Sequence, residues 1–110
     1  MTAPDPMATA YEALAQRAWD SNRERAAELS TLVADWRATG VLTEERRERA
    51  RWLGHSVRGS AGTFGHQRAA DAADQLQSLL HAEDRPSLNV VAGLVEQIEQ
   101  ALAEPPRLEI

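Results

Sequence analysis

Four of the six glycines in this chain fall within one short stretch, Gly54–Gly65. The same stretch carries apolar residues at helical spacing, namely Leu53, Val57, Ala61 and Phe64. Each glycine inside a helix costs roughly 1 kcal/mol relative to alanine. The pattern therefore predicts an amphipathic helix whose glycines serve a purpose other than the stability of the helix itself.

A histidine and two of these glycines are predicted to share the solvent face of that helix. Residues at i, i+3, i+4 and i+7 share a helical face, and counted from His55 these are Arg58, Gly59 and Gly62. His55 lies about 200° from Leu53 at 100° per residue, so its ring points away from the apolar stripe. An exposed imidazole nitrogen is a nucleophile, and a neighbouring guanidinium suits phosphoryl oxygens. The spacing indicates a site that carries a phosphoryl group.

The run from His55 to Gly65, HSVRGSAGTFG, resembles the signature of histidine-containing phosphotransfer (HPt) domains. That signature reads His, any residue, apolar, Lys or Arg, Gly, Ser or Ala, small, two variable residues, apolar, Gly, and every fixed position is filled. The motif covers about a tenth of the chain, and the similarity extends weakly to Leu80. The resemblance implies that His55 takes a phosphoryl group from an aspartyl phosphate on a receiver domain and passes it to another receiver.

The resemblance also implies the partners and the cofactor. The partners are receiver domains of a hybrid histidine kinase and of a response regulator. Magnesium is expected on the partner receiver, and no cofactor is expected on this chain. We expect a phosphoryl carrier rather than an enzyme, because the sequence contains no nucleotide-binding loop.

Further site residues are predicted around His55. Arg58 matches the basic position of the family and is expected to face the phosphoryl group. Gln77 lies 22 residues after His55, where family members often place a polar residue that hydrogen-bonds the inner ring nitrogen. An ordinary exposed glutamine is an equal alternative, and Gln75 or Asp74 takes the role if the helical register differs.

The docking surface of the partner is predicted to include bare backbone and one aromatic ring. Gly59 shares the outward face of His55, which favours clearance for a partner over a tight helix–helix contact. Gly62 suits either purpose. Trp52 lies one turn before His55 and is expected to flank the docking surface, although packing is the default for a tryptophan.

The other two histidines, His66 and His81, are expected to be bystanders. Neither has another histidine at i+3 or i+4, and the chain has no cysteine, so we expect no metal site.

Composition excludes several function classes. A chain of 110 residues forms one domain with a modest core. Its net charge of −5 makes nucleic acid an unexpected partner. No apolar run approaches the roughly 18 residues of a membrane span, and the N-terminus lacks the pattern of a signal peptide. We therefore expect a cytoplasmic monomer without a membrane or nucleic-acid partner.

The apolar periodicity and the scarcity of valine and isoleucine predict an all-α fold, an antiparallel up-and-down four-helix bundle. The expected helices run from Met7 to Gly40, from Thr43 to Phe64, from His66 to Ala82, and from Pro86 to the residues before Pro105. Ser21–Glu24 has the pattern of a capping box. Either a new helix starts there, which leaves an extra short N-terminal helix before it, or the motif lies within one long helix. The predicted organisation is a disordered N-terminus (1–6), the bundle (7–104) and a mobile tail (105–110).

Two functions remain open from the sequence. The first is a phosphoryl carrier. The second is a non-catalytic helical adaptor that binds or sequesters a receiver domain. The pair of His55 and Arg58 favours the carrier, since an adaptor does not need the histidine.

Overall fold

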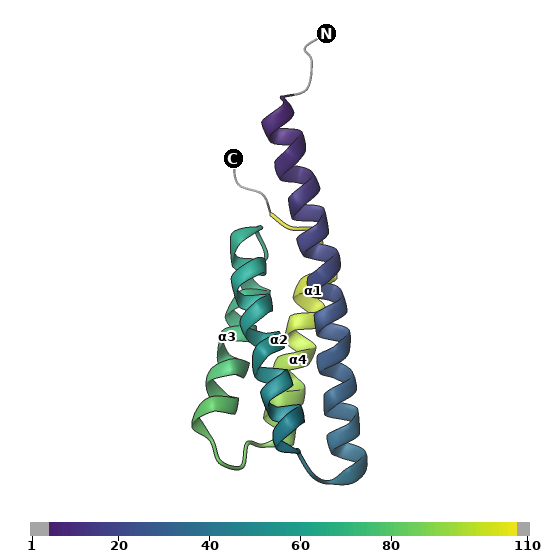
Figure 1. The fold of residues 1–110 in the computed structure, drawn as a ribbon, viewed down its shortest axis with the longest axis vertical. Coiled ribbons are helices and arrows are strands. Elements are labelled where there is room, and N and C mark those ends of the chain that lie inside the picture. Colours follow the sequence, from purple (N-terminus) through teal and green to yellow (C-terminus); the bar gives the residue numbers. More distant parts are fainter. Residues whose placement is uncertain (1–4, 108–110) are drawn as a thin grey trace.

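The structure is a computed structural model that describes residues 5–107. Four helices follow one another along the chain, α1 (Pro6–Thr39), α2 (Glu44–Thr63), α3 (Gln67–Ala82) and α4 (Leu88–Leu102). Among these residues α1 packs against α2 and α4, and α3 packs against the same two helices (Figure 1). The predicted all-helical bundle is confirmed. Residues 1–4 and 108–110, which belong to the predicted disordered N-terminus and mobile tail, lie outside the described residues.

The first helix is one unbroken element of 34 residues, about 51 Å long at 1.5 Å per residue. It passes through Ser21–Glu24 without interruption, so the capping box is absorbed and no separate N-terminal helix forms. Asp5 caps its start by accepting a hydrogen bond from the Met7 amide, and Gly40 ends it with a φ of 76°. The first turns of α1 project beyond the ends of the other three helices (Figure 1).

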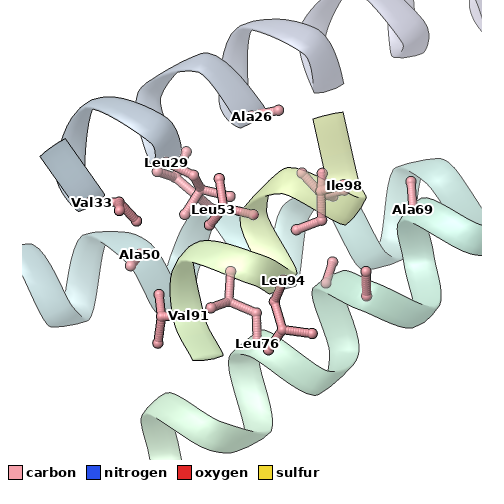
Figure 2. Packing of buried hydrophobic residues seen from close by; sticks show 14 of the residues in the cluster. Ala26, Leu29, Val33, Ala50, Leu53, Ala69, Leu76, Val91, Leu94 and Ile98 are labelled. Carbon is pink, nitrogen blue, oxygen red and sulfur yellow. The ribbon is translucent and has the colours of Figure 1, made fainter. Parts of the chain in front are cut away.

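The core is built from the apolar faces of all four helices (Figure 2). Its largest fully buried apolar side chains are Leu29, Leu53, Val57, Leu76, Leu80, Ile98 and Leu102. Small residues on α3, among them Ala69 and Ala73, are buried as well and let α2 approach closely. Two polar residues are buried as well, Asn22 and His66. The buried Asn22 of α1 donates to the Ser60 hydroxyl of α2 at 3.2 Å and accepts from Arg25 at 2.8 Å.

The helix starts follow from their capping side chains. Thr43 accepts from the Arg46 amide, as its position predicts. The last helix begins at Leu88 rather than at Pro86, because the Ser87 side chain accepts from the Val90 amide and is therefore the N-cap. Pro86 lies just outside the helix.

The charged run at the start of α2 is not entirely solvent-exposed. Arg47 is half-buried and reaches across to the end of α3. Its guanidinium donates to the main-chain carbonyls of Leu80 at 2.9 Å and Asp84 at 3.0 Å, and to that of Glu83. These carbonyls have no partner within the helix, so Arg47 caps α3 from a neighbouring helix.

The segment after α4 closes the end of the bundle from which α1 projects. The Arg107 amide donates to the Gly65 carbonyl at 3.0 Å, and the Trp19 indole donates to the Leu102 carbonyl at 2.7 Å. His66 is buried beneath this segment with Nε2 at 2.8 Å from the Glu104 carbonyl. Gly65 has a φ of +90°, and a side chain there would collide with Arg107. These contacts attach residues 103–107 to the bundle.

Candidate functional site

The site is centred on His55, near the middle of α2, with its side chain exposed. On the opposite side of the helix Leu53, Val57 and Ala61 are buried against the other helices. Because these three side chains anchor α2 in the core, the rotation of the helix is set and the imidazole faces solvent.

Arg58 lies one turn after His55 and is also exposed. Its Nε is 3.3 Å from Oδ1 of Asp74 on α3, and both side chains are about half exposed. An exposed ion pair of this kind is worth about 0–1 kcal/mol. A charge-assisted hydrogen bond from the same guanidinium to an anionic group would be worth more, about 1.5–3 kcal/mol. Asp74, an alternative in the sequence analysis for contacting His55, therefore keeps Arg58 beside the exposed face but binds it weakly.

The glycines of α2 have different surroundings. A Cβ added at Gly59 would meet nothing within 4 Å, so this position is open space. At Gly62 an added Cβ would lie 3.6 Å from the Ala70 Cβ, an ordinary contact with α3. Gly54 is buried, and its added Cβ would lie 3.4 Å from the Ala73 carbonyl oxygen. Gly54 thus permits close packing of α2 and α3, whereas Gly59 leaves bare backbone on the solvent face.

The role of Gly54 was missed in the sequence analysis, although a signal was present. Gly54 borders the apolar stripe, directly after Leu53 and one turn before Val57, whereas Gly59 lies on the face of His55. Counting helical angles separately for each glycine distinguishes a packing glycine from an exposed one.

Gln77 lies on α3 beside Gly54, with its Cβ 3.7 Å from the position of an added Gly54 Cβ. It is therefore level with His55 along the bundle. Its Oε1 is buried and has no hydrogen-bond partner among the described residues, and no hydrogen bond joins it to His55 there. Buried acceptors are nearly always paired, so this oxygen awaits a donor. Gln75, the other alternative, is exposed.

Trp52 flanks His55 on the side of α1, with 51% of its surface exposed. The Arg49 guanidinium lies over its ring, 4.7 Å from the centroid. Arg49 also donates to Glu28 of α1 at 2.9 Å. This hydrogen bond lowers the pKa of Glu28 below its usual value, against the opposing effect of partial burial. Glu28 thus positions Arg49, and Arg49 positions the exposed Trp52 ring one turn from His55.

The remaining histidines have other partners. His66 is buried at the end of the bundle, as described above. His81 is exposed, and its Nδ1 lies 3.0 Å from Nη2 of Arg51. Within residues 5–107 no group of three histidine, cysteine or acidic side chains is arranged to hold a metal ion. Over the same range, none of the helices combines the length and the apolar character needed to span a membrane.

An exposed histidine halfway along one helix of an antiparallel bundle, beside a cation and a bare glycine, defines a class of helical carrier proteins. Comparison with protein families gives the particular family. The model of the Hpt domain matches residues 13–105, and the chain therefore belongs to the Hpt domain family. No curated protein and no solved structure matches the chain significantly.

Membership defines the role in general terms. Hpt domains are phosphocarriers rather than catalysts, and they interact with receiver domains in phosphorelays. The chain accordingly has a role in histidine phosphotransfer.

Proposed function

We propose that His55 carries a phosphoryl group between the aspartates of two receiver domains, one in a hybrid histidine kinase and one in a response regulator. The observation that supports this most directly is the exposed ring of His55 on a face that Gly59 leaves bare. A receiver approaching that face meets no side chain at i+4. Arg58 lies one turn away on the same side.

The transfer is a displacement at phosphorus. The lone pair of the outer ring nitrogen, Nε2 of His55, forms the P–N bond while the P–O bond to the receiver aspartate breaks. The aspartate carboxylate leaves with the electron pair, and Nδ1 keeps its proton. The reverse displacement passes the group to the second receiver. Magnesium on the receiver supplies charge neutralisation at the phosphoryl oxygens, and this chain supplies the nucleophile, the Arg58 cation and the docking face.

The transfer itself tests the proposal. Incubation with a phosphorylated receiver domain from the same organism is expected to label the protein with a group that is labile in acid and stable in alkali, as a phosphoramidate requires. Phosphorus-coupled NMR is expected to locate the group on Nε2. ATP and magnesium alone are expected to give no label. A stable complex with the receiver, but without any label under these conditions, would instead establish the adaptor.

We predict that Arg58→Ala slows transfer by about ten- to a hundredfold, since the phosphoryl group loses a contact worth about 1.5–3 kcal/mol. The rate is measured by rapid quench with a phosphorylated receiver. Arg85→Ala, an exposed arginine in the loop after α3, is the matched control and is expected to transfer at the unaltered rate. An unaltered rate in Arg58→Ala would exclude a phosphoryl-facing role for this cation.

We further propose that the unpaired Gln77 Oε1 accepts from Nδ1–H of His55 and so holds the tautomer with a free Nε2. Gln77→Leu is expected to lower the transfer rate by up to about tenfold, the value of one net hydrogen bond. Nitrogen-15 NMR is expected to show a smaller fraction of the Nδ1–H tautomer. Gln77→Glu keeps an acceptor and is expected to restore the fraction of the Nδ1–H tautomer. Gln75→Leu, on the exposed side of α3, is expected to leave that fraction unchanged. A tautomer ratio that does not move in Gln77→Leu would contradict the proposal.

A further inference from the structure

Two buried polar atoms, one on α2 and one on α3, lack a hydrogen-bond partner among the described residues. They are Nε of Arg51 and Oε1 of Gln77. Buried polar atoms are nearly always paired. The Arg51 nitrogen carries a proton and can only donate, whereas the Gln77 oxygen can only accept. Each of the two atoms is therefore a suitable partner for the other.

The contacts between α2 and α3, which pack against each other (Figure 1), place the two side chains side by side. Nη2 of Arg51 lies 3.0 Å from Nδ1 of His81, which is one turn after Gln77 on α3. Gly54 is one turn after Arg51 on α2, and its added Cβ would lie 3.7 Å from the Cβ of Gln77. Arg51 and Gln77 are thus neighbours across the helix contact. Arg51 also lies one turn before His55 on the same face of α2.

The guanidinium of Arg51 is held in this place by its other nitrogens. Nη1 donates to Oε1 of Glu48 at 2.8 Å. Nη2 donates to Nδ1 of His81, because a guanidinium has no acceptor. The Arg51 side chain is only 33% exposed. Anchored by two partners, it keeps a buried Nε–H beside Gln77 that has no hydrogen bond of its own.

The orientation of the Gln77 carboxamide decides what it offers to His55. With its oxygen toward the ring, the carboxamide accepts from Nδ1–H and leaves the lone pair of Nε2 free. After a half turn it would present its NH2 group, which donates to Nδ1 and favours the tautomer that carries the proton on Nε2. That tautomer has no lone pair on Nε2 with which to attack phosphorus. The rate of transfer therefore depends on which way the carboxamide faces.

We propose, on the basis of the phosphotransfer role proposed above for His55, that Arg51 is a positioning residue. Its Nε–H donates to Oε1 of Gln77 and holds the carboxamide oxygen toward the imidazole. Because Arg51 can only donate, it pairs with this oxygen and not with the NH2 group. The oxygen has two lone pairs, so it accepts from Arg51 and from His55 together. The terminal torsion of glutamine is soft, so the carboxamide turns to close this hydrogen bond while the helices stay in place.

Nitrogen-15 NMR of the unphosphorylated protein, in mildly alkaline buffer, tests the proposal. Arg51→Met keeps a long side chain but removes Nε–H, and it is expected to lower the fraction of the Nδ1–H tautomer of His55. It is also expected to slow transfer from a phosphorylated receiver by up to about tenfold. The matched control is Arg46→Met, a half-buried arginine of α2 whose ion-pair partner is Asp35 of α1. This control is expected to leave the tautomer fraction and the transfer rate unchanged, and circular dichroism verifies that both variants are folded.

Variants of Gln77 show whether Arg51 acts through the carboxamide. In the Gln77→Leu background, Arg51→Met is expected to lower the tautomer fraction no further. In the Gln77→Glu background it is expected to leave that fraction unchanged, because a carboxylate presents an oxygen whichever way it is turned. The Nε–H signal of Arg51 is expected to exchange slowly with solvent in the wild type and faster in Gln77→Leu.

The tautomer measurement needs no receiver, so it decides the role of Arg51 separately from the proposed phosphotransfer. An unchanged tautomer fraction in Arg51→Met overturns the role of Arg51 and leaves the phosphotransfer proposal standing. A further loss of the Nδ1–H tautomer in the Gln77→Leu or Gln77→Glu background overturns it as well, because Arg51 would then act on His55 by another route. Absence of label on the wild-type protein would instead refute the phosphotransfer.

Discussion

Replacement of His55 by glutamine is expected to abolish labelling by a phosphorylated receiver domain entirely. The imidazole proposed to accept the phosphoryl group is then absent. Glutamine keeps similar size and polarity at an exposed position, so the fold is expected to persist. The measurement is the amount of acid-labile phosphate per chain, together with the thermal midpoint of the variant. The predicted loss is complete, because neither the neighbouring arginine nor the backbone can accept a phosphoryl group.

The other two histidines provide the controls. His81→Gln is the closer match because His81 is exposed, and it is expected to retain full labelling. His66→Gln is expected to retain the label as well, with a lower thermal midpoint, because His66 is buried and its Nε2 contacts the Glu104 carbonyl. Persistent labelling of His55→Gln by a cognate receiver would show that another residue accepts the phosphoryl group, and would exclude His55 as the acceptor.

The second large effect is expected from two glycine substitutions on α2 with opposite consequences. Gly59→Leu is expected to fold with an equal or higher thermal midpoint, since the position is open and leucine gains up to about 1 kcal/mol of helix propensity. Transfer from the receiver is nevertheless expected to fall at least tenfold, because the new side chain stands where the partner must approach. Gly54→Leu is expected to destabilise the fold, by about 1–3 kcal/mol or more, since it separates α2 from α3.

Urea unfolding and transfer rates measured on both variants show whether each glycine leaves space for the receiver or permits close packing of α2 against α3. Gly54→Ala is the milder control, because its Cβ would lie 3.4 Å from the Ala73 carbonyl oxygen and requires only a small shift. If Gly59→Leu proved as unstable as Gly54→Leu, Gly59 would be a packing residue. If Gly59→Leu transferred at the normal rate, the receiver would dock elsewhere on the helix.

Much of the fold was predictable because its signals are local. The helix ends at Gly40 and Thr43 and the apolar stripe through Leu53 and Val57 depend on residues only a few positions apart. In the structure Gly40 and Thr43 cap their helices, and Leu53 and Val57 are buried, as expected. The start of α4 was misplaced because Pro86 and Ser87 are both acceptable near a helix start, and the hydrogen bond to the Val90 amide decides between them. The continuity of α1 past residue 21 depends on tertiary packing, which a capping motif does not report.

The site was predictable to the extent that it lies on one helix. His55, Arg58 and Gly59 share a face by helical geometry alone, and the structure places all three on the exposed side of α2. Contacts between helices were not predictable in the same way. The ion pair of Arg58 with Asp74 and the capping of α3 by Arg47 depend on how far α2 slides along α3, which no spacing within one helix determines.

The buried Asn22 has a consequence for the alignment of α1 with α2. Apolar seams of alanine and leucine look much the same after a slide of one turn, about 5.4 Å, so they specify the longitudinal register weakly. In the observed register Asn22 meets the Ser60 hydroxyl. A slide of one turn that brings Phe64 to this place leaves the buried amide of Asn22 without that partner, at a cost of about 1–3 kcal/mol. The polar contact thereby opposes a slide in that direction and supports the register in which Glu28 meets Arg49 beside Trp52.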